Sequence, residues 1–108
     1  MNLNKFLPLT ETMYYILLSL LKPLHGYGIM QRIGKLSDNN VKIAAGTLYG
    51  ALENLIKQNL IELSKEIGDE RRKVYNLTPL GYDVLIMEFE RIKKLLNLSI
   101  ELLEEEQT

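Results

Sequence analysis

Hydrophobic residues recur at the three- and four-residue spacing of an amphipathic helix in four stretches of this chain. The pattern predicts helices over residues 10–21, about 29–36, 45–58 and 79–106. Thr10 and Thr78 are suited to cap two of these helices, and Pro79 suits the first position of the last one. The spacing predicts that the following residues point inward: Met13, Ile16, Leu17, Leu20, Leu21, Ile29, Met30, Ile33, Leu36, Leu48, Leu52, Leu55 and Ile56.

Shorter alternating stretches predict strands at residues 41–43, from residue 60 and over 73–78, where Tyr75 is expected in the core. Residues 68–72 supply the turn of a hairpin, and residues 24–28 form a tight connection in which His25 is expected to bond nearby backbone. Three helices followed by a hairpin and a long helix predict a mainly α (α+β) fold, a winged helix-turn-helix. We expect this domain over residues 1–78 and a dimerisation helix over 79–108.

Composition limits the chemistry that the chain can perform. The sequence has 108 residues, no cysteine and one histidine, which fits one domain and excludes a disulfide scaffold, a thiolate site or a multi-histidine metal site. No serine lies in a nucleophile-elbow motif that would make His25 part of a catalytic triad. We therefore expect neither an enzyme nor a cofactor. No signal peptide and no apolar run of about 18 residues is found, so a cytoplasmic protein is expected.

Charge is distributed unevenly along the chain, although the net charge is only −1. Residues 22–80 hold nine basic and six acidic side chains, whereas residues 81–108 hold three basic and seven acidic ones. This asymmetry indicates that the first part contacts a polyanion and that the acidic part has another role.

The outward side of the third predicted helix carries small or polar residues. A helix enters the major groove of DNA when such a surface lets it approach the base edges. Thr47 and Asn54 are candidate base contacts, and the hairpin tip is expected to bind the DNA backbone. Tyr49 has an alternative role, since it can pack at the edge of the helix. The candidate DNA-binding residues are Thr47, Tyr49, Gly50, Asn54, Lys57, Arg71, Arg72 and Lys73.

The last helix carries an apolar seam typical of a coiled coil. Its positions Leu85, Phe89, Ile92, Leu96 and Leu103 follow one another at spacings of 4, 3, 4 and 7, with Ser99 at the skipped position. The helix is longer than the small body that precedes it, so the seam predicts a homodimer. The alternative is that the seam folds back on its own domain.

Three motifs occur together in the predicted helices and the hairpin. They are Leu24-His25-Gly26-Tyr27-Gly28-Ile29, then Gly46-Thr47-Leu48-Tyr49 with Leu52 and Leu55, and Arg71-Arg72-Lys73-Val74-Tyr75-Asn76-Leu77-Thr78-Pro79-Leu80-Gly81. With them the chain resembles the PadR family of bacterial transcription regulators, in its short branch with a single C-terminal dimerisation helix. The chain departs from the family at Ala45-Gly46, where many relatives carry a proline.

The resemblance implies a homodimeric repressor that binds double-stranded DNA at a palindromic operator and is released by a small-molecule effector. Some short-branch relatives hold flat aromatic drugs between tryptophans at the dimer centre. This chain has no tryptophan, and Ile92 takes the corresponding place. The dimer centre is then either an apolar ligand site or a filled interface. The rival function for the whole chain is a winged-helix module that binds protein and not DNA. The candidate ligand-binding residues are Tyr14, Tyr15, Leu18, Phe89 and Ile92.

Overall fold

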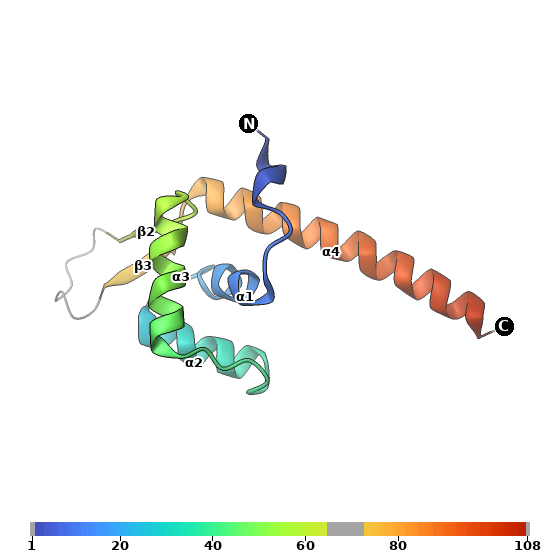
Figure 1. Cartoon of the computed structure of the whole chain (residues 1–108), viewed down its shortest axis with the longest axis horizontal. Coiled ribbons are helices and arrows are strands. Elements are labelled where there is room, and N and C mark those ends of the chain that lie inside the picture. The colour runs from blue at the N-terminus through green and yellow to red at the C-terminus, as the bar shows by residue number, and fades with distance from the viewer. Residues whose placement is uncertain (1, 65–72, 108) are drawn as a thin grey trace.

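The computed structural model describes residues 2–64 and 73–107, which form a small body and one projecting helix (Figure 1). The molecule measures 60 × 36 × 20 Å, because the C-terminal half of the last helix extends away from the body. The elements are a 3-10 helix Leu3–Phe6, α1 Glu11–Ser19, β1 Leu24–His25, α2 Gly26–Leu36, α3 Ala45–Lys57, β2 Ile61–Leu63, β3 Val74–Leu77 and α4 Pro79–Glu106.

The helix starts that the sequence predicts are confirmed at α1 and α4. The N–H of Met13 donates to Thr10 Oγ1 at 3.1 Å, and the N–H of Gly81 donates to Thr78 Oγ1 at 2.9 Å. Each threonine thus satisfies a backbone donor that the first turn of a helix leaves without a partner. Pro79 begins α4, where its missing N–H has no consequence.

The three strands form an antiparallel sheet in the order β1-β3-β2. The strand predicted at residues 41–43 is wrong, because this segment is a loop in which the Val41 N–H donates to Ser37 Oγ at 3.0 Å. Instead, Leu24 pairs with Tyr75 in a segment that we expected to be a connection. α2 consequently begins at Gly26, earlier than the hydrophobic spacing predicts.

The core lies where the inner sides of α1, α2, α3, the sheet and the start of α4 meet. Leu21 and Leu36 were expected inside but are 55% and 50% exposed. Leu21 follows the end of α1, so helical spacing no longer fixes its direction, and Leu36 is the last residue of α2. Tyr75 is buried as predicted. The buried apolar residues are Ile16, Leu17, Leu20, Ile29, Ile33, Leu48, Leu52, Leu55, Leu60, Ile61, Tyr75, Val84 and Leu85.

The core includes the first turns of α4, so the body continues beyond residue 78. Leu85, which we expected in the dimerisation seam, is 2% exposed and packs in the core of its own chain. The seam prediction is wrong at this position. Residues on one side of a helix point in the same direction, but they can pack against different parts of the structure. Over residues 2–64 and 73–107, none of the helices combines the length and the hydropathy of a membrane span.

The start of α4 is fixed to the turn that joins α3 to β2. The Thr78 N–H donates to the Leu60 carbonyl at 3.1 Å, and Thr78 Oγ1 donates to the Asn59 carbonyl at 2.6 Å. Gly81 lies directly against this turn, since a Cβ added there would be 1.8 Å from the Leu60 oxygen. A residue larger than glycine therefore has no room at position 81.

The N-terminal arm is held on α4 by a buried carboxylate. The Leu9 N–H donates to Glu88 Oε2 at 2.6 Å, and Arg91 Nε donates to Glu88 Oε1. Burial raises the pKa of Glu88, but the hydrogen bonds from Arg91 and Leu9 lower it by more than burial raises it. The pKa of Glu88 therefore lies below its ordinary value. Burial, and then the negative charge of Glu88, raise the pKa of Tyr14 on the neighbouring α1.

Candidate nucleic-acid interface

Two sides of α3 differ sharply in character. Its inner side carries Leu48, Leu52 and Leu55, which are all buried. At about 100° per residue, the outer side spans roughly 120° of the helix. All of its residues are exposed, and they are Gly46, Thr47, Gly50, Glu53, Asn54 and Lys57. We call this set the outer face of α3.

The two glycines of the outer face have no packing role within the described chain. A Cβ added to Gly46 or Gly50 would meet no atom within 4 Å. A glycine inside a helix destabilises it by about 1 kcal/mol relative to alanine. These residues therefore lower the surface of the helix without improving the fold, which suits a helix that another molecule approaches closely.

Asn54 is present on the outer face as predicted, but it is hydrogen-bonded. Gln58 Nε2 donates to Asn54 Oδ1 at 3.0 Å, one helical turn away. The Asn54 amide nitrogen can still donate and Oδ1 keeps a second lone pair, so both groups of a two-point contact with adenine remain available beside the Gln58 bond. Sequence reasoning missed Gln58, although the four-residue spacing from Asn54 indicates such a pair.

Tyr49 lies beside the outer face and packs against the start of α2. A Cβ on Gly26 would lie 2.4 Å from the Tyr49 hydroxyl oxygen and 2.8 Å from Cζ. Burial, followed by the nearby Tyr49, raises the pKa of Tyr75. These contacts are those of the alternative role, packing at the edge of α3. Because Tyr49 remains 49% exposed, a contact with DNA stays a prediction.

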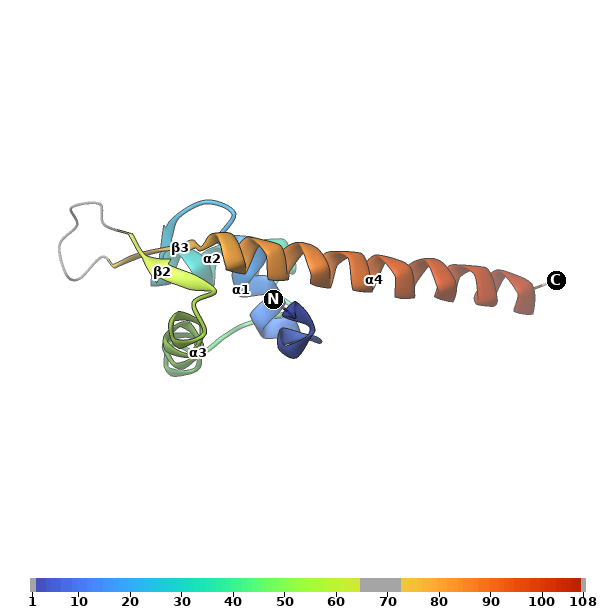
Figure 2. The same cartoon turned by 90° about the horizontal axis from the view of Figure 1, so that it is seen from above.

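The sheet lies beside α3 at one end of the molecule, and α4 projects in the other direction (Figures 1 and 2). Strands β2 and β3 form the hairpin that we call the wing. Asn76 Nδ2 on β3 donates to Glu62 Oε1 on β2 at 3.1 Å. Lys73 is exposed at the start of β3. Arg71 and Arg72 lie outside the described residues. The structure thus brings Lys73 to the same end as α3.

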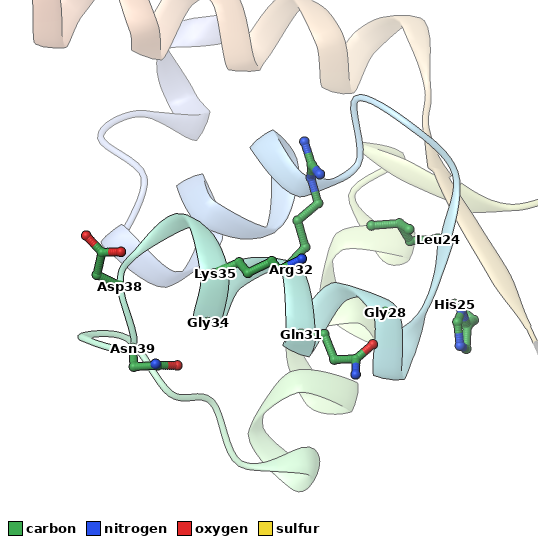
Figure 3. A pocket seen from close by; sticks show the side chains of 9 residues that line it. All are labelled: Leu24, His25, Gly28, Gln31, Arg32, Gly34, Lys35, Asp38 and Asn39. Carbon is green, nitrogen blue, oxygen red and sulfur yellow. The ribbon is translucent and has the colours of Figure 1, made fainter.

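A shallow groove runs along α2 and is lined by no residue of α3 (Figure 3). It contains cations, Arg32 and Lys35, together with the carboxylate of Asp38. His25 lies at one end of this groove, and its side chain makes no capping hydrogen bond to α2. The groove is open and mixed in charge. Because no residue of α3 lines it, it is separate from the outer face of α3.

The candidate ligand-binding residues lie on two helices that pack together. Tyr14, Tyr15 and Leu18 are half-buried on α1 and pack against the core. Phe89 is 46% exposed on α4, and Ile92 is half-buried one turn later. Because α1 packs against α4, these two sets come from neighbouring elements.

The projecting half of α4 exposes a broad apolar surface. By helical spacing, it continues the side on which Val84 and Leu85 are buried in the body. Within the described chain nothing covers this surface, which consists of Leu95, Leu96, Leu98, Ile100, Leu102 and Leu103. Single exposed leucines are ordinary, but a contiguous apolar surface of this extent indicates an association site.

Comparison with known proteins connects these features to a family. A sequence model of the transcriptional regulator PadR-like family matches residues 16–86. An uncharacterized protein of Lysinibacillus sphaericus is 34% identical over 88 residues, which cover 77% of this chain and 81% of that protein.

Two solved structures have the same fold. A PadR family transcriptional regulator from Eggerthella lenta has a TM-score of 0.68 and 29% identity, covering 86% of this chain and 81% of its own. A winged-helix DNA-binding protein from STIV has a TM-score of 0.67 and 25% identity, covering 78% and 89%. The predicted winged-helix fold is thereby confirmed.

Proposed function

Because the chain belongs to the PadR-like family of transcriptional regulators, we propose that it is a dimeric cytoplasmic repressor that binds a palindromic operator. Members of this family regulate transcription and are not enzymes. The observation that carries the proposal is the outer face of α3, where Gly46 and Gly50 face open space among polar side chains. A surface of this kind suits close approach to base edges in the major groove.

Individual residues of α3 have different roles in this proposal. The helix has 13 residues and is about 20 Å long at 1.5 Å per residue, and it lies in the groove with its outer face toward the bases. Thr47, near its N-terminus, contacts bases with its hydroxyl group. Asn54 contacts a base through its amide nitrogen and the second lone pair of its amide oxygen. Lys57 in the last turn binds a phosphate, and Tyr49 does so from the edge of the helix.

The wing binds the DNA backbone next to the groove that α3 enters. Lys73 contributes one cation from the described part of the wing, and the sequence supplies two more in Arg71 and Arg72. Each phosphate that such a side chain neutralises releases condensed counterions. Removing one of these cations therefore weakens binding to all sequences and lowers the log–log salt dependence by about one unit.

The exposed apolar surface of α4 supports a homodimer. At about 1 kcal/mol for each half-exposed leucine or isoleucine that becomes buried, the six residues of this surface in each chain are a substantial driving force for association. Phe89, Ile92, Leu96 and Leu103 form the seam, now without Leu85. A symmetric dimer presents two copies of α3 related by a two-fold axis, and this symmetry is what a palindromic operator matches.

We further propose that a flat, mostly apolar molecule acts as effector at the dimer interface, between α1 and α4. Tyr14, Tyr15, Leu18, Phe89 and Ile92 supply apolar surface with phenol hydroxyls at its edge. Such a ligand releases DNA if it favours a spacing of the two α3 helices other than the ~34 Å that successive major grooves require. Titration of planar aromatic cations against tyrosine fluorescence tests this site. No saturable change, or a change unaffected by Ile92→Ala, points to a filled interface.

The DNA-binding proposal is tested by fluorescence anisotropy with duplexes from the region upstream of the protein's own gene. We expect one of them to bind at least tenfold more tightly than a scrambled duplex at the same salt concentration, a difference of about 1.4 kcal/mol. Equal affinity for both contradicts a sequence-specific repressor. If the chain also passes unretained through heparin at low salt, the rival protein-binding module is favoured.

A further inference from the structure

We propose that Glu53 determines base specificity by accepting a hydrogen bond from the exocyclic amine of a cytosine in each half-site. This inference rests on the proposed DNA-binding function of α3 and assigns a role to a residue that none of the preceding roles uses. Carboxylates that recognise bases in the major groove accept from the cytosine N4 amine. Guanine and thymine present oxygen acceptors at the corresponding positions, and these repel a carboxylate.

Glu53 is the anionic side chain of the outer face of α3, and it is exposed. Lys57 lies four residues further on, at the spacing of an intrahelical ion pair, yet the two do not form one. Within residues 2–64 and 73–107, the Glu53 carboxylate has no hydrogen-bond partner either. Its acceptor oxygens are therefore available to another molecule.

The position of this charge has an energetic consequence. A carboxylate that approaches the DNA backbone is repelled by the phosphates, so Glu53 weakens binding to an arbitrary sequence. Only an amine donor in the groove offsets this repulsion. The same residue thus lowers non-specific affinity and favours a site that presents cytosine, and both effects increase the ratio of specific to non-specific binding.

The neighbouring glycines give the Glu53 side chain room to reach the bases. Side chains on a helix lean toward its N-terminus and cover the preceding turn. For Glu53 this turn contains Gly50, and Gly46 follows on the same side, where neither residue has a side chain to block it. The Glu53 side chain therefore has open space over Gly50 and Gly46.

The test is selection of binding sites from a duplex library with a randomised half-site, using the full chain and its Glu53→Ala and Glu53→Gln variants. We expect wild-type sites to contain cytosine at one position of each half-site. In Glu53→Ala, the preference for cytosine over the other bases should fall at least fivefold at that position alone. This change corresponds to about 1 kcal/mol. It should also bind a random duplex more tightly. Glu53→Gln should shift the preference toward adenine, which a side-chain amide recognises.

Lys57→Ala is the matched control on the same side of the helix. It should weaken binding to all sequences while leaving the cytosine preference intact. Alanine and glutamine are good helix formers at this exposed position, so thermal unfolding followed by circular dichroism should show all variants folded.

The inference is overturned if Glu53→Ala keeps the wild-type preference at every position, or if it loses affinity equally for all sequences. A wild-type chain that selects no sequence at all would contradict the proposed function itself, and the role of Glu53 with it. A wild-type chain that selects sites without cytosine at a fixed position contradicts the role of Glu53 alone.

Discussion

Replacing Gly50 by alanine should change stability and DNA binding in opposite directions. A Cβ at position 50 meets no atom within 4 Å, so the free protein accommodates the added methyl group without strain. Position 50 lies inside the helix Ala45–Lys57, where glycine is about 0.5–1 kcal/mol less favourable than alanine. The variant should therefore be more stable than wild type. For a domain of this size, such a gain corresponds to a rise in Tm of about 3–6 °C.

Gly50→Ala should bind DNA more weakly, because the added methyl group meets a neighbour only in the complex. If the outer face of α3 lies against base edges, the new methyl group occupies the space through which the helix backbone approaches them. Separating the helix from the groove lengthens the contacts made by Thr47 and Asn54. Losing one good base contact costs about 1–3 kcal/mol, so specific affinity should fall at least fivefold.

The assay combines thermal unfolding by circular dichroism with fluorescence anisotropy on the selected operator. Wild type and variants are unfolded at the same protein concentration, because dimerisation shifts the apparent stability. Gly34→Ala in α2 is the control, since a Cβ there would be an ordinary 3.4 Å from Asn39 Oδ1. It should leave DNA binding unchanged. Unchanged operator affinity of Gly50→Ala would refute the close approach of α3, and a lower Tm would refute the open space at Gly50.

Two further substitutions test the packing that positions the interface. Gly81→Ala should lower the free energy of unfolding by at least about 3 kcal/mol in urea denaturation, because the added Cβ would lie 1.8 Å from the Leu60 carbonyl oxygen; a wild-type midpoint would contradict this contact. Glu88→Gln should lower the free energy of unfolding by about 1–3 kcal/mol at neutral pH, since Leu9 and Arg91 bond different oxygens and the amide group of glutamine offers only one acceptor. The folded-state pKa of Glu88 is lowered, so its contribution is complete above the unfolded pKa of about 4.3 and is lost as the pH falls through the folded value. The difference between wild type and Glu88→Gln should therefore shrink on acidification, and a constant difference would argue against the charge.

Local chemistry was sufficient to predict the helices and the starts of α1 and α4. Thr10 and Thr78 cap α1 and α4 because a hydroxyl at that place satisfies backbone donors within three residues. The outer face of α3 could also be predicted, since burial of the leucines on one side determines which residues remain outside. These features depend only on sequence neighbours.

Long-range pairing could not be predicted in the same way. β1 has two residues, too few to show a period, and it exists because β3 offers it a free edge. Gly26 and Tyr49 fit together across two helices, which neither local pattern reveals. The seam residues Leu85 and Phe89 share one side of α4, but only the tertiary structure shows that the body ends between them.

Ser99 should mark the point where the α4 helices of the proposed dimer approach each other most closely. It is the small residue within a surface of leucines and isoleucines, and its hydroxyl already donates to the Leu95 carbonyl at 2.7 Å. Its burial at an interface therefore leaves no polar group without a partner. The two copies of residue 99 then face each other where the helices cross.

The absence of cysteine from the chain makes this crossing directly measurable. A disulfide requires two Cβ atoms about 3.5–4.5 Å apart, which the two copies of residue 99 approach only where the helices cross. Ser99→Cys should therefore form a covalent dimer under mild oxidation, in proportion to the dimer seen by sedimentation. Asn97→Cys is the control, because helical spacing places it on the opposite side of α4, and it should stay monomeric on a denaturing gel. Equal cross-linking of both variants would show random collision. A sedimenting dimer in which Ser99→Cys does not cross-link would place the crossing elsewhere on α4, since two helices in contact at this small side chain bring their cysteines within bonding distance.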